Sequence, residues 1–228
     1  MILLSSAYLP NIQYMSKILS NETAWIDTCE NFQKQTFRSR AIINSPQGQL
    51  PLTIPVQSGA ASECPIKEVK ISDHGNWRHR HWNAIKSTYG KSAFFEYLAP
   101  EIEPFFAKRY QWLLDFNCQL LDTIIRLCQI SVDIHLTDHY ISFDELKRLN
   151  MIDCRDMIRP KNPIPDPNFQ PYPYYQTLSE NGFIPNLSII DLLFECGYET
   201  ESILSKCYVN PHSQKIKHQS TKSQKSEF

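Results

Sequence analysis

Residues 2–27 read ILLSSAYLPNIQYMSKILSNETAWID, and the predicted fold class rests on this stretch. The apolar run over 2–7 predicts a short buried strand, and Pro10 predicts a loop after it. Apolar residues then recur at helical spacing over 12–19, and 24–27 predict a second strand. A strand, a loop, a helix and a strand in this order are typical of α/β proteins. We therefore expect an α/β fold whose sheet begins at the N-terminus.

Helical periodicity returns in the middle of the chain. A helix over 77–89 ends at Gly90, and a longer helix with a continuous 3.6-residue period covers about 100–130. Shorter helices are expected after the capping residue Ser142 and over 187–194. The long helix is the largest element that the sequence predicts.

The remaining segments complete a single domain with a mixed sheet. Further strands are expected at 50–56, 69–71 and 132–136. Six prolines within 160–173 predict an irregular, partly extended segment there. From residue 210 onward the chain is polar and has few apolar residues to bury. We expect one domain over 1–209, followed by a disordered polar tail over 210–228.

The composition excludes several classes of protein. Lys and Arg total 23 against 24 Asp and Glu, so any attraction to nucleic acid or to an anionic membrane would need a local patch, and we expect no nucleic-acid partner. Only six glycines are present, and neither G-x-G-x-x-G nor G-x-x-x-x-G-K-[ST] occurs. The absence of G-x-S-x-G also argues against an α/β-hydrolase.

The cysteines and the N-terminus indicate a cytoplasmic protein. The seven cysteines form an odd, scattered set without a C-x-x-C pair, which favours reduced thiols. The N-terminus has no basic region, and its apolar run is shorter than that of a signal peptide. No stretch approaches the ~18 apolar residues that cross a bilayer, so we expect no membrane insertion.

A basic cluster is the first candidate binding site. Lys34, Arg38 and Arg40 lie close together, and in an extended segment Arg38 and Arg40 project to the same side. Two guanidinium groups so placed can hold a phosphate or a carboxylate through charge-assisted hydrogen bonds. The alternative is a solvated strand edge that carries protective charges.

The second candidate is the helical run WRHRHW at 77–82. Helical geometry places His81 on the face that also carries Trp77 and Ile85, so His81 could act as a general base tuned by burial. Arg78 lies elsewhere around the helix and could contact an anion. The alternative is a core histidine with satisfied hydrogen bonds beside exposed arginines.

Two other sets of polar residues are weaker candidates. Asp133, His135, Asp138 and His139 have the chemistry of metal ligands, but a strand that leaves into a loop points the two imidazoles apart, so we predict no metal site. Asp115 interrupts the apolar period of the long helix. It either meets a cation or a cleft, or lies on the solvent face.

Taken together, four segments resemble the WbqC-like protein family. They are SAYLPNIQY at 6–14 with Lys17, FQKQTFRSR at 32–40 with LTIPV at 52–56, the helix 77–89 with His81, and GFIPNLSIIDLLF at 182–194. Their order and spacing are more specific than any one of them, and the resemblance extends from residue 1 to about 197.

The chain departs from the family pattern at two places. Many members carry His-Gln-Pro before the first helix, whereas Tyr8 and Leu9 precede Pro10 here, so a role for that histidine does not carry over. Many members also have an acidic pair where this chain has DTCE at 27–30. Asp27 is retained, and Glu30 stands in for its partner.

The resemblance implies a function. Proteins of this family are bacterial, the family takes its name from a polysaccharide (O-antigen) gene cluster, and transfer of an amino-acyl or glycyl group onto sugars has been suggested for it. We therefore expect a cytoplasmic transferase of surface-polysaccharide synthesis that acts on an anionic or nucleotide-linked sugar. The residues identify no cofactor.

The expected site lies where the first strand meets the Pro10 loop, because α/β sheets bind ligands beyond the carboxyl ends of their strands. The expected catalytic residues are His81, which would move a proton, and Asp27. The expected substrate-binding residues are Gln13, Tyr14, Lys17, Lys34, Arg38, Arg40, Arg78 and Asn186. We expect the segments around 13–17, 34–40 and 78–82 to meet in one cleft.

A second function class uses the same residues. A non-catalytic binding module could hold a sugar, a nucleotide or a nucleic-acid segment in the same basic, aromatic cleft, because stacking platforms are plentiful in this chain. Such a module would tolerate the loss of His81 and would lose affinity without Arg38 or Arg40. The sequence predicts no oligomeric state.

Overall fold

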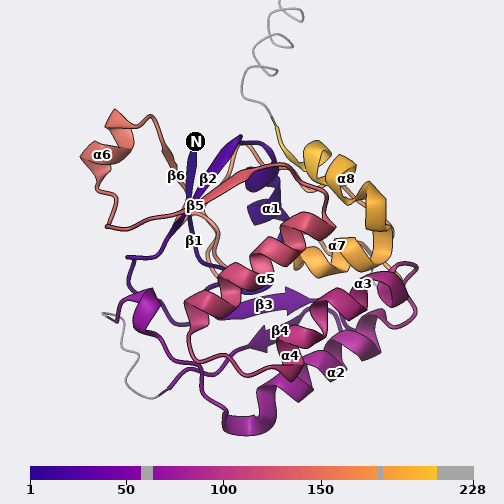
Figure 1. Ribbon diagram of the computed structural model, residues 1–228. Coiled ribbons are helices and arrows are strands. Elements are labelled where there is room, and N and C mark those ends of the chain that lie inside the picture. The colour runs from indigo at the N-terminus through magenta and orange to yellow at the C-terminus, as the bar shows by residue number, and fades with distance from the viewer. Residues whose placement is uncertain (58–63, 179–181, 210–228) are drawn as a thin grey trace, which may run out of the picture.

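The computed structural model describes residues 1–57, 64–178 and 182–209. The chain forms an α/β domain around a four-stranded parallel sheet with the order β5-β2-β1-β6 (Figure 1). Its strands are β1 (Ile2–Ser5), β2 (Thr23–Asp27), β5 (Asp133–Leu136) and β6 (Ile152–Asp153). The predicted α/β class and the N-terminal strand are confirmed.

The first strand–helix–strand unit forms as predicted. Helix α1 (Ile12–Leu19) follows β1, and Asn11 caps it by accepting a hydrogen bond from the backbone N–H of Tyr14. Strands β1 and β2 pair in parallel, with Ser5 opposite Asp27. The carboxyl ends of both strands therefore lie side by side at one edge of the sheet.

A separate two-stranded sheet lies beyond that edge. Strands β3 (Arg40–Ile43) and β4 (Leu50–Thr53) pair antiparallel, with Arg40 opposite Thr53 (Figure 1). The mixed sheet expected from the sequence is thus divided into a parallel sheet and a small antiparallel one. The loop before β3 contacts the chain just after β1, because the backbone N–H of Tyr8 donates to the carbonyl of Phe37 at 2.8 Å.

The predicted strand at 69–71 was wrong. This segment follows a 3-10 helix (Ile66–Glu68) and makes only isolated bridges. On one side it bridges to 55–57. On the other it contacts the loop that leads into a later helix, since Ile71 donates to the carbonyl of Gln111 and Leu113 donates to that of Val69.

The same pairing explains why the helix expected over 100–130 is interrupted. The region holds α3 (Phe95–Ile102), α4 (Pro104–Ala107) and α5 (Leu113–Leu127). Pro104 begins α4, and the chain becomes extended at Lys108. The longest of these helices therefore starts at Leu113, well after the predicted position.

The remaining helices agree better with the sequence. Helix α2 (Trp77–Tyr89) has the predicted bounds, and Gly90 follows it. Helix α6 (Phe143–Arg148) begins at the predicted cap Ser142. Helix α7 (Ile189–Cys196) matches the prediction closely, whereas α8 (Thr200–Cys207) was not predicted. The predicted tail at 210–228 lies outside the described residues.

The helices cover the two faces of the parallel sheet unequally. Figure 1 shows α1, α5, α7 and α8 on one side of the sheet and α6 on the other. The main core lies on the first side, while Leu3, Ile141, Leu146 and Met151 form a small separate cluster under α6. Within the described ranges, no helix is both long and apolar enough to span a bilayer.

Candidate functional site

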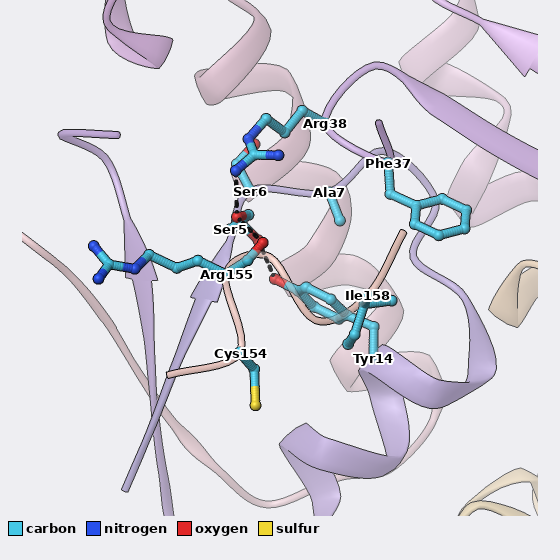
Figure 2. A pocket seen from close by; sticks show the side chains of 9 residues that line it. All are labelled: Ser5, Ser6, Ala7, Tyr14, Phe37, Arg38, Cys154, Arg155 and Ile158. Atoms are coloured by element: carbon cyan, nitrogen blue, oxygen red, sulfur yellow. Dashed lines mark hydrogen bonds between the residues drawn. The ribbon is translucent and has the colours of Figure 1, made fainter. Parts of the chain in front are cut away.

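Ser5 lies at the carboxyl end of β1 and is the centre of a buried polar cluster (Figure 2). Its Oγ lies 2.8 Å from Glu30 Oε2 and 2.8 Å from the backbone oxygen of Arg155, and it accepts a hydrogen bond from Arg38 Nη2 at 2.8 Å. A hydroxyl has one proton, so it donates to one of the two acceptors at a time. The Ser5 hydroxyl thus lies between a carboxylate and a guanidinium.

Glu30 and Arg38 form a buried ion pair beside this hydroxyl. Arg38 Nε donates to Glu30 Oε1 at 2.9 Å, and Nη2 donates to Oε2. Both side chains are about 5% exposed. Burial raises the pKa of the Glu30 carboxyl, although hydrogen bonds from Arg38 and Ser5 oppose the shift. A carboxylate with a raised pKa in contact with a hydroxyl is suited to accept a proton from it.

Asp27 and Arg155 form a second ion pair at the same edge. Arg155 Nη1 donates to Asp27 Oδ2 at 2.7 Å, and Nη2 donates to Asp153 Oδ2 at 2.7 Å. Asp27 is completely buried, and its other oxygen accepts a hydrogen bond from the backbone N–H of Cys29. Asp27 therefore fixes Arg155, whose backbone oxygen contacts Ser5.

A small cavity opens beside the cluster. Its volume is about 10 Å³, and its walls include Ser5, Tyr14, Arg38, Cys154 and Arg155 (Figure 2). The Tyr14 hydroxyl donates to the backbone oxygen of Ser5 at 2.8 Å, so Tyr14 fixes the end of β1. A cavity of this size holds about one water molecule, so only a small reacting group fits inside it.

Three of the expected substrate-binding residues, Gln13, Lys17 and Asn186, do not line the small cavity beside Ser5. Lys17 Nζ contacts Asp166 Oδ1 at 2.8 Å, and Gln13 Nε2 donates to Asp166 Oδ2 at 2.9 Å. Asn186 accepts from the backbone N–H of Gln13 at 2.9 Å. The two contacts with Asp166 attach the proline-rich segment over 160–173 to α1, and Asp166 neutralises the charge of Lys17.

Three other expected residues lie outside the walls of the Ser5 cavity. Lys34 is exposed. Arg40 Nε donates to Thr53 Oγ1 at 3.2 Å, and Arg78 Nη2 donates to Asp73 at 2.6 Å. Of the expected basic cluster, only Arg38 lies at the carboxyl ends of the strands.

His81 lies in an aromatic environment. Its Nδ1 shares a hydrogen bond of 2.9 Å with the hydroxyl of Tyr8, its ring stacks on that of Tyr8, and Trp77 packs edge-on against it. Burial, together with the nearby Arg80 charge, lowers the pKa of His81 to about 4. The imidazole is therefore neutral at pH 7, as in the core-histidine alternative.

Residues 5–8 bring the predicted segments together. Ser5 contacts Arg38, and Tyr8 contacts His81. Asn117 on α5 links the two sides, because its Nδ2 donates to Ser6 Oγ and to the backbone oxygen of Arg38, both at 2.8 Å. Arg38 and His81 nevertheless line different cavities, the Ser5 cavity and a second one between β4 and α2.

The histidines considered as metal ligands lie in different surroundings. His135 stacks on Trp25 with ring centroids 4.8 Å apart, whereas His139 contacts Asp138 and Glu145. In the part of the chain that the structure describes, no group of three or more potential ligands gathers.

Comparison with models of protein families gives a match that covers most of the chain. The chain matches the model of the WbqC-like protein family over residues 5–159 and 166–203, and it belongs to this family. It is also 25% identical over 227 residues to the uncharacterized protein Rv1507c of Mycobacterium tuberculosis, and the match covers 90% of this chain and 97% of that relative. No solved structure matches it.

Proposed function

We propose that the protein is a group transferase of bacterial surface-polysaccharide (O-antigen) synthesis that acts in the cytoplasm on an anionic or nucleotide-linked sugar. Membership of the WbqC-like family supports the biological setting. The Ser5 hydroxyl between Glu30 and Arg38 supports the chemistry, and this one observation carries the proposal. Its position also agrees with the general place of ligand sites in α/β sheets.

The proposed reaction moves an amino-acyl or similar small acyl group. Ser5 Oγ attacks the acyl carbon, the bond from that carbon to the leaving group breaks, and Glu30 takes the hydroxyl proton. Arg38 stabilises the negative charge that develops on the acyl oxygen. Glu30 passes this first proton to the leaving group. An amine or hydroxyl of the sugar then attacks the ester carbon, Glu30 takes the proton that this group loses, and Glu30 gives it to Ser5 Oγ as the ester bond breaks.

The size of the Ser5 cavity sets a limit on this reaction. About 10 Å³ holds one water-sized group, so at most the reacting acyl carbonyl enters the cavity. The rest of the substrate therefore lies outside the cavity. Asp27 acts as a positioning residue in this proposal, because it holds Arg155, whose backbone oxygen contacts the Ser5 hydroxyl.

A thermal-shift screen tests the proposal. Nucleotides, nucleotide sugars and amino acids are added separately to the purified protein, and a ligand at about 100 times its Kd should stabilise the fold by roughly 2.7 kcal/mol. We expect a hit among nucleotide sugars or amino acids that is lost in Arg38→Met. The absence of a shift across all these classes would contradict a transferase with such substrates.

A second candidate function is non-catalytic binding of a sugar, a nucleotide or a nucleic-acid segment. The neutral, hydrogen-bonded state of His81 favours it, because His81 lines the larger cavity between β4 and α2 without an evident role in proton transfer. A binding module would keep its ligand affinity in Ser5→Ala. The transferase would bind its ligand in that variant and lose turnover.

A further inference from the structure

Strand β5 is an edge strand of the parallel sheet. Strand β2 pairs with one side of it, and within the segments that the structure describes no strand pairs with the other side. The backbone N–H of Asp133 points toward β2, because it donates to the carbonyl of Glu22 at 3.0 Å. Backbone groups alternate in direction along a strand, so those of Ile134 and Leu136 point away from β2. Strand β5 therefore presents an open hydrogen-bonding edge.

This edge is less protected against pairing than the opposite edge of the sheet. The other edge strand, β6, has only two residues, and a very short strand offers little to pair with. Residues 132–136 read VDIHL, without the proline or lysine that commonly blocks an edge. Leu136 is 51% exposed. An added strand would therefore join this sheet at β5.

The sequence over 132–136 is chemically complementary to itself in the antiparallel direction. Two copies that pair about Ile134 bring their Ile134 residues opposite each other. Val132 of one copy then lies opposite Leu136 of the other. Asp133 lies opposite His135, whose imidazole can donate a hydrogen bond to the carboxylate. Because a two-fold axis relates the copies, the apolar pair and the polar pair each occur twice.

The alternative register lacks this complementarity. Pairing about His135 would place the two imidazoles opposite each other. Val132 would then lie opposite Asp138, so an apolar side chain would face a carboxylate. Cross-strand pairs of compatible chemistry stabilise a sheet, and the pairing about Ile134 is therefore the favoured one.

The side chains that form the polar pair are available for it. Asp133 and His135 are both exposed, and as alternate residues of a strand they lie on the same face of the sheet. The His135 ring stacks on Trp25 of β2, with ring centroids 4.8 Å apart. This stack already restricts the ring, so ordering it in an interface costs less conformational entropy.

We propose that β5 pairs with β5 of a second copy of the chain, antiparallel and about Ile134, so that the two parallel sheets join into one. The N–H of Ile134 would donate to the carbonyl of Ile134 in the other copy, and that of Leu136 to the carbonyl of Val132. A standard interface has roughly 20–30 residues a side, far more than this strand, so we expect a dimer that dissociates on dilution.

Sedimentation velocity and hydrogen exchange test this dimer on the purified full-length chain. Between roughly 1 and 500 µM, sedimentation should show conversion of monomer to dimer. Exchange of the Ile134 and Leu136 amides, followed by NMR, should slow at the higher concentration. The Asp133 amide is the internal control and should change much less, because it already donates to Glu22.

Three results of these measurements would overturn the proposal. One is a monomer at every concentration. Another is a dimer in which exchange at Ile134 and Leu136 does not change, because the copies would then meet at another surface. The third is slow exchange at these amides that is independent of concentration, which would mean that a segment of the same chain covers the edge.

Charge variants test the register of the pairing. His135→Asp places two carboxylates opposite each other and should weaken dimerisation about tenfold. Combining it with Asp133→His restores the pair in the reverse order and should recover the wild-type affinity. His79→Asp, at an exposed histidine on α2, is the control and should leave dimerisation unchanged. A double variant that dimerises as weakly as His135→Asp would overturn pairing about Ile134.

Discussion

Ser5 Oγ and Glu30 Oε2 lie 2.8 Å apart, although 25 positions separate the two residues in the chain. The contact forms because β1 ends at Ser5, at the edge of the sheet where the chain after β2 also turns. Glu30 meets Arg38 at the same point. The hydrogen bond therefore depends on the register of β1 and β2 and on the loop before β3, which carries Arg38.

The Glu30–Arg38 pair should be important for stability. Glu30→Gln leaves the buried Arg38 charge without its partner, so we expect a loss of about 3–5 kcal/mol in the free energy of unfolding. Urea denaturation measures this loss. As a control, Glu101→Gln removes the exposed partner of Arg126 and should cost at most about 1 kcal/mol. Equal losses in the two variants would show that the Glu30 pair is solvated.

His81 should make the stability depend on pH. The pKa of His81 is about 4 in the folded protein and 6.5 when unperturbed, so the unfolded chain binds the proton more strongly. The free energy of unfolding should therefore fall as the pH falls from about 6.5 to 4, by up to about 3 kcal/mol relative to a variant without the histidine.

The comparison with His81→Gln isolates this effect. Asp191 changes the free energy of unfolding with pH in the opposite direction, because burial raises the pKa of its carboxyl to about 6 in the folded protein. Asp191 is present in both proteins, so its contribution cancels in the difference. Denaturation at several pH values gives the difference directly. A difference between wild type and His81→Gln that does not vary between pH 7 and pH 4 would contradict a buried neutral imidazole.

The cysteines should all be free thiols with unequal reactivity. All seven are unpaired in the structure. Burial raises the pKa of the Cys118 thiol to about 11 and that of Cys154 to about 11, so both should react slowly with iodoacetamide in the native protein. Alkylation in denaturant without reductant should modify seven thiols by mass spectrometry, and a reproducible count of five would indicate a disulfide.

Asp166 should hold the proline-rich segment against α1. Asp166→Asn removes the ion pair with Lys17 and weakens the contact with Gln13. We expect faster limited proteolysis within 160–173, measured by mass spectrometry of the fragments. Asp122→Asn, at an exposed position on α5, serves as the control. An unchanged cleavage rate in Asp166→Asn would mean that other contacts hold the segment.

The sequence predicted well those elements whose bounds are set by residues close to them in the chain. Helices α1 and α2 have apolar periodicity and clear ends at Asn11 and Gly90, and their bounds agree with the prediction. The break before α5 was missed because the apolar period continues through it. That break is set by pairing with 69–71, which is far away in the chain.

The site was only partly predictable for the same reason. Arg38 was found from its basic neighbours, but its partner Ser5 carries no signal beyond its place within the strand predicted over 2–7. Arg155 follows β6, a strand of two residues that has no recognisable pattern. Lys17 has the charge expected of an anion-binding residue, and only the fold shows that Asp166 neutralises it.

The base in the proposed reaction can be tested by kinetics. Glu30→Gln keeps the shape of the side chain and cannot accept the Ser5 proton, so acylation by p-nitrophenyl acetate should slow about 100-fold or more. The measurement is the rate of p-nitrophenolate release before turnover. Circular dichroism and urea denaturation establish that the variant is folded under the assay conditions. A folded variant with the wild-type rate would exclude Glu30 as the base.

The most direct test of the proposed site is the position of the acyl group after reaction with p-nitrophenyl acetate. Ser5 Oγ forms the ester, p-nitrophenolate leaves, and Glu30 takes the proton. Intact-mass spectrometry with peptide mapping should show one acetyl group on Ser5 in the wild type and none at this position in Ser5→Ala. Labelling confined to lysines or cysteines, or no labelling at all, would contradict the assignment of Ser5 as the nucleophile.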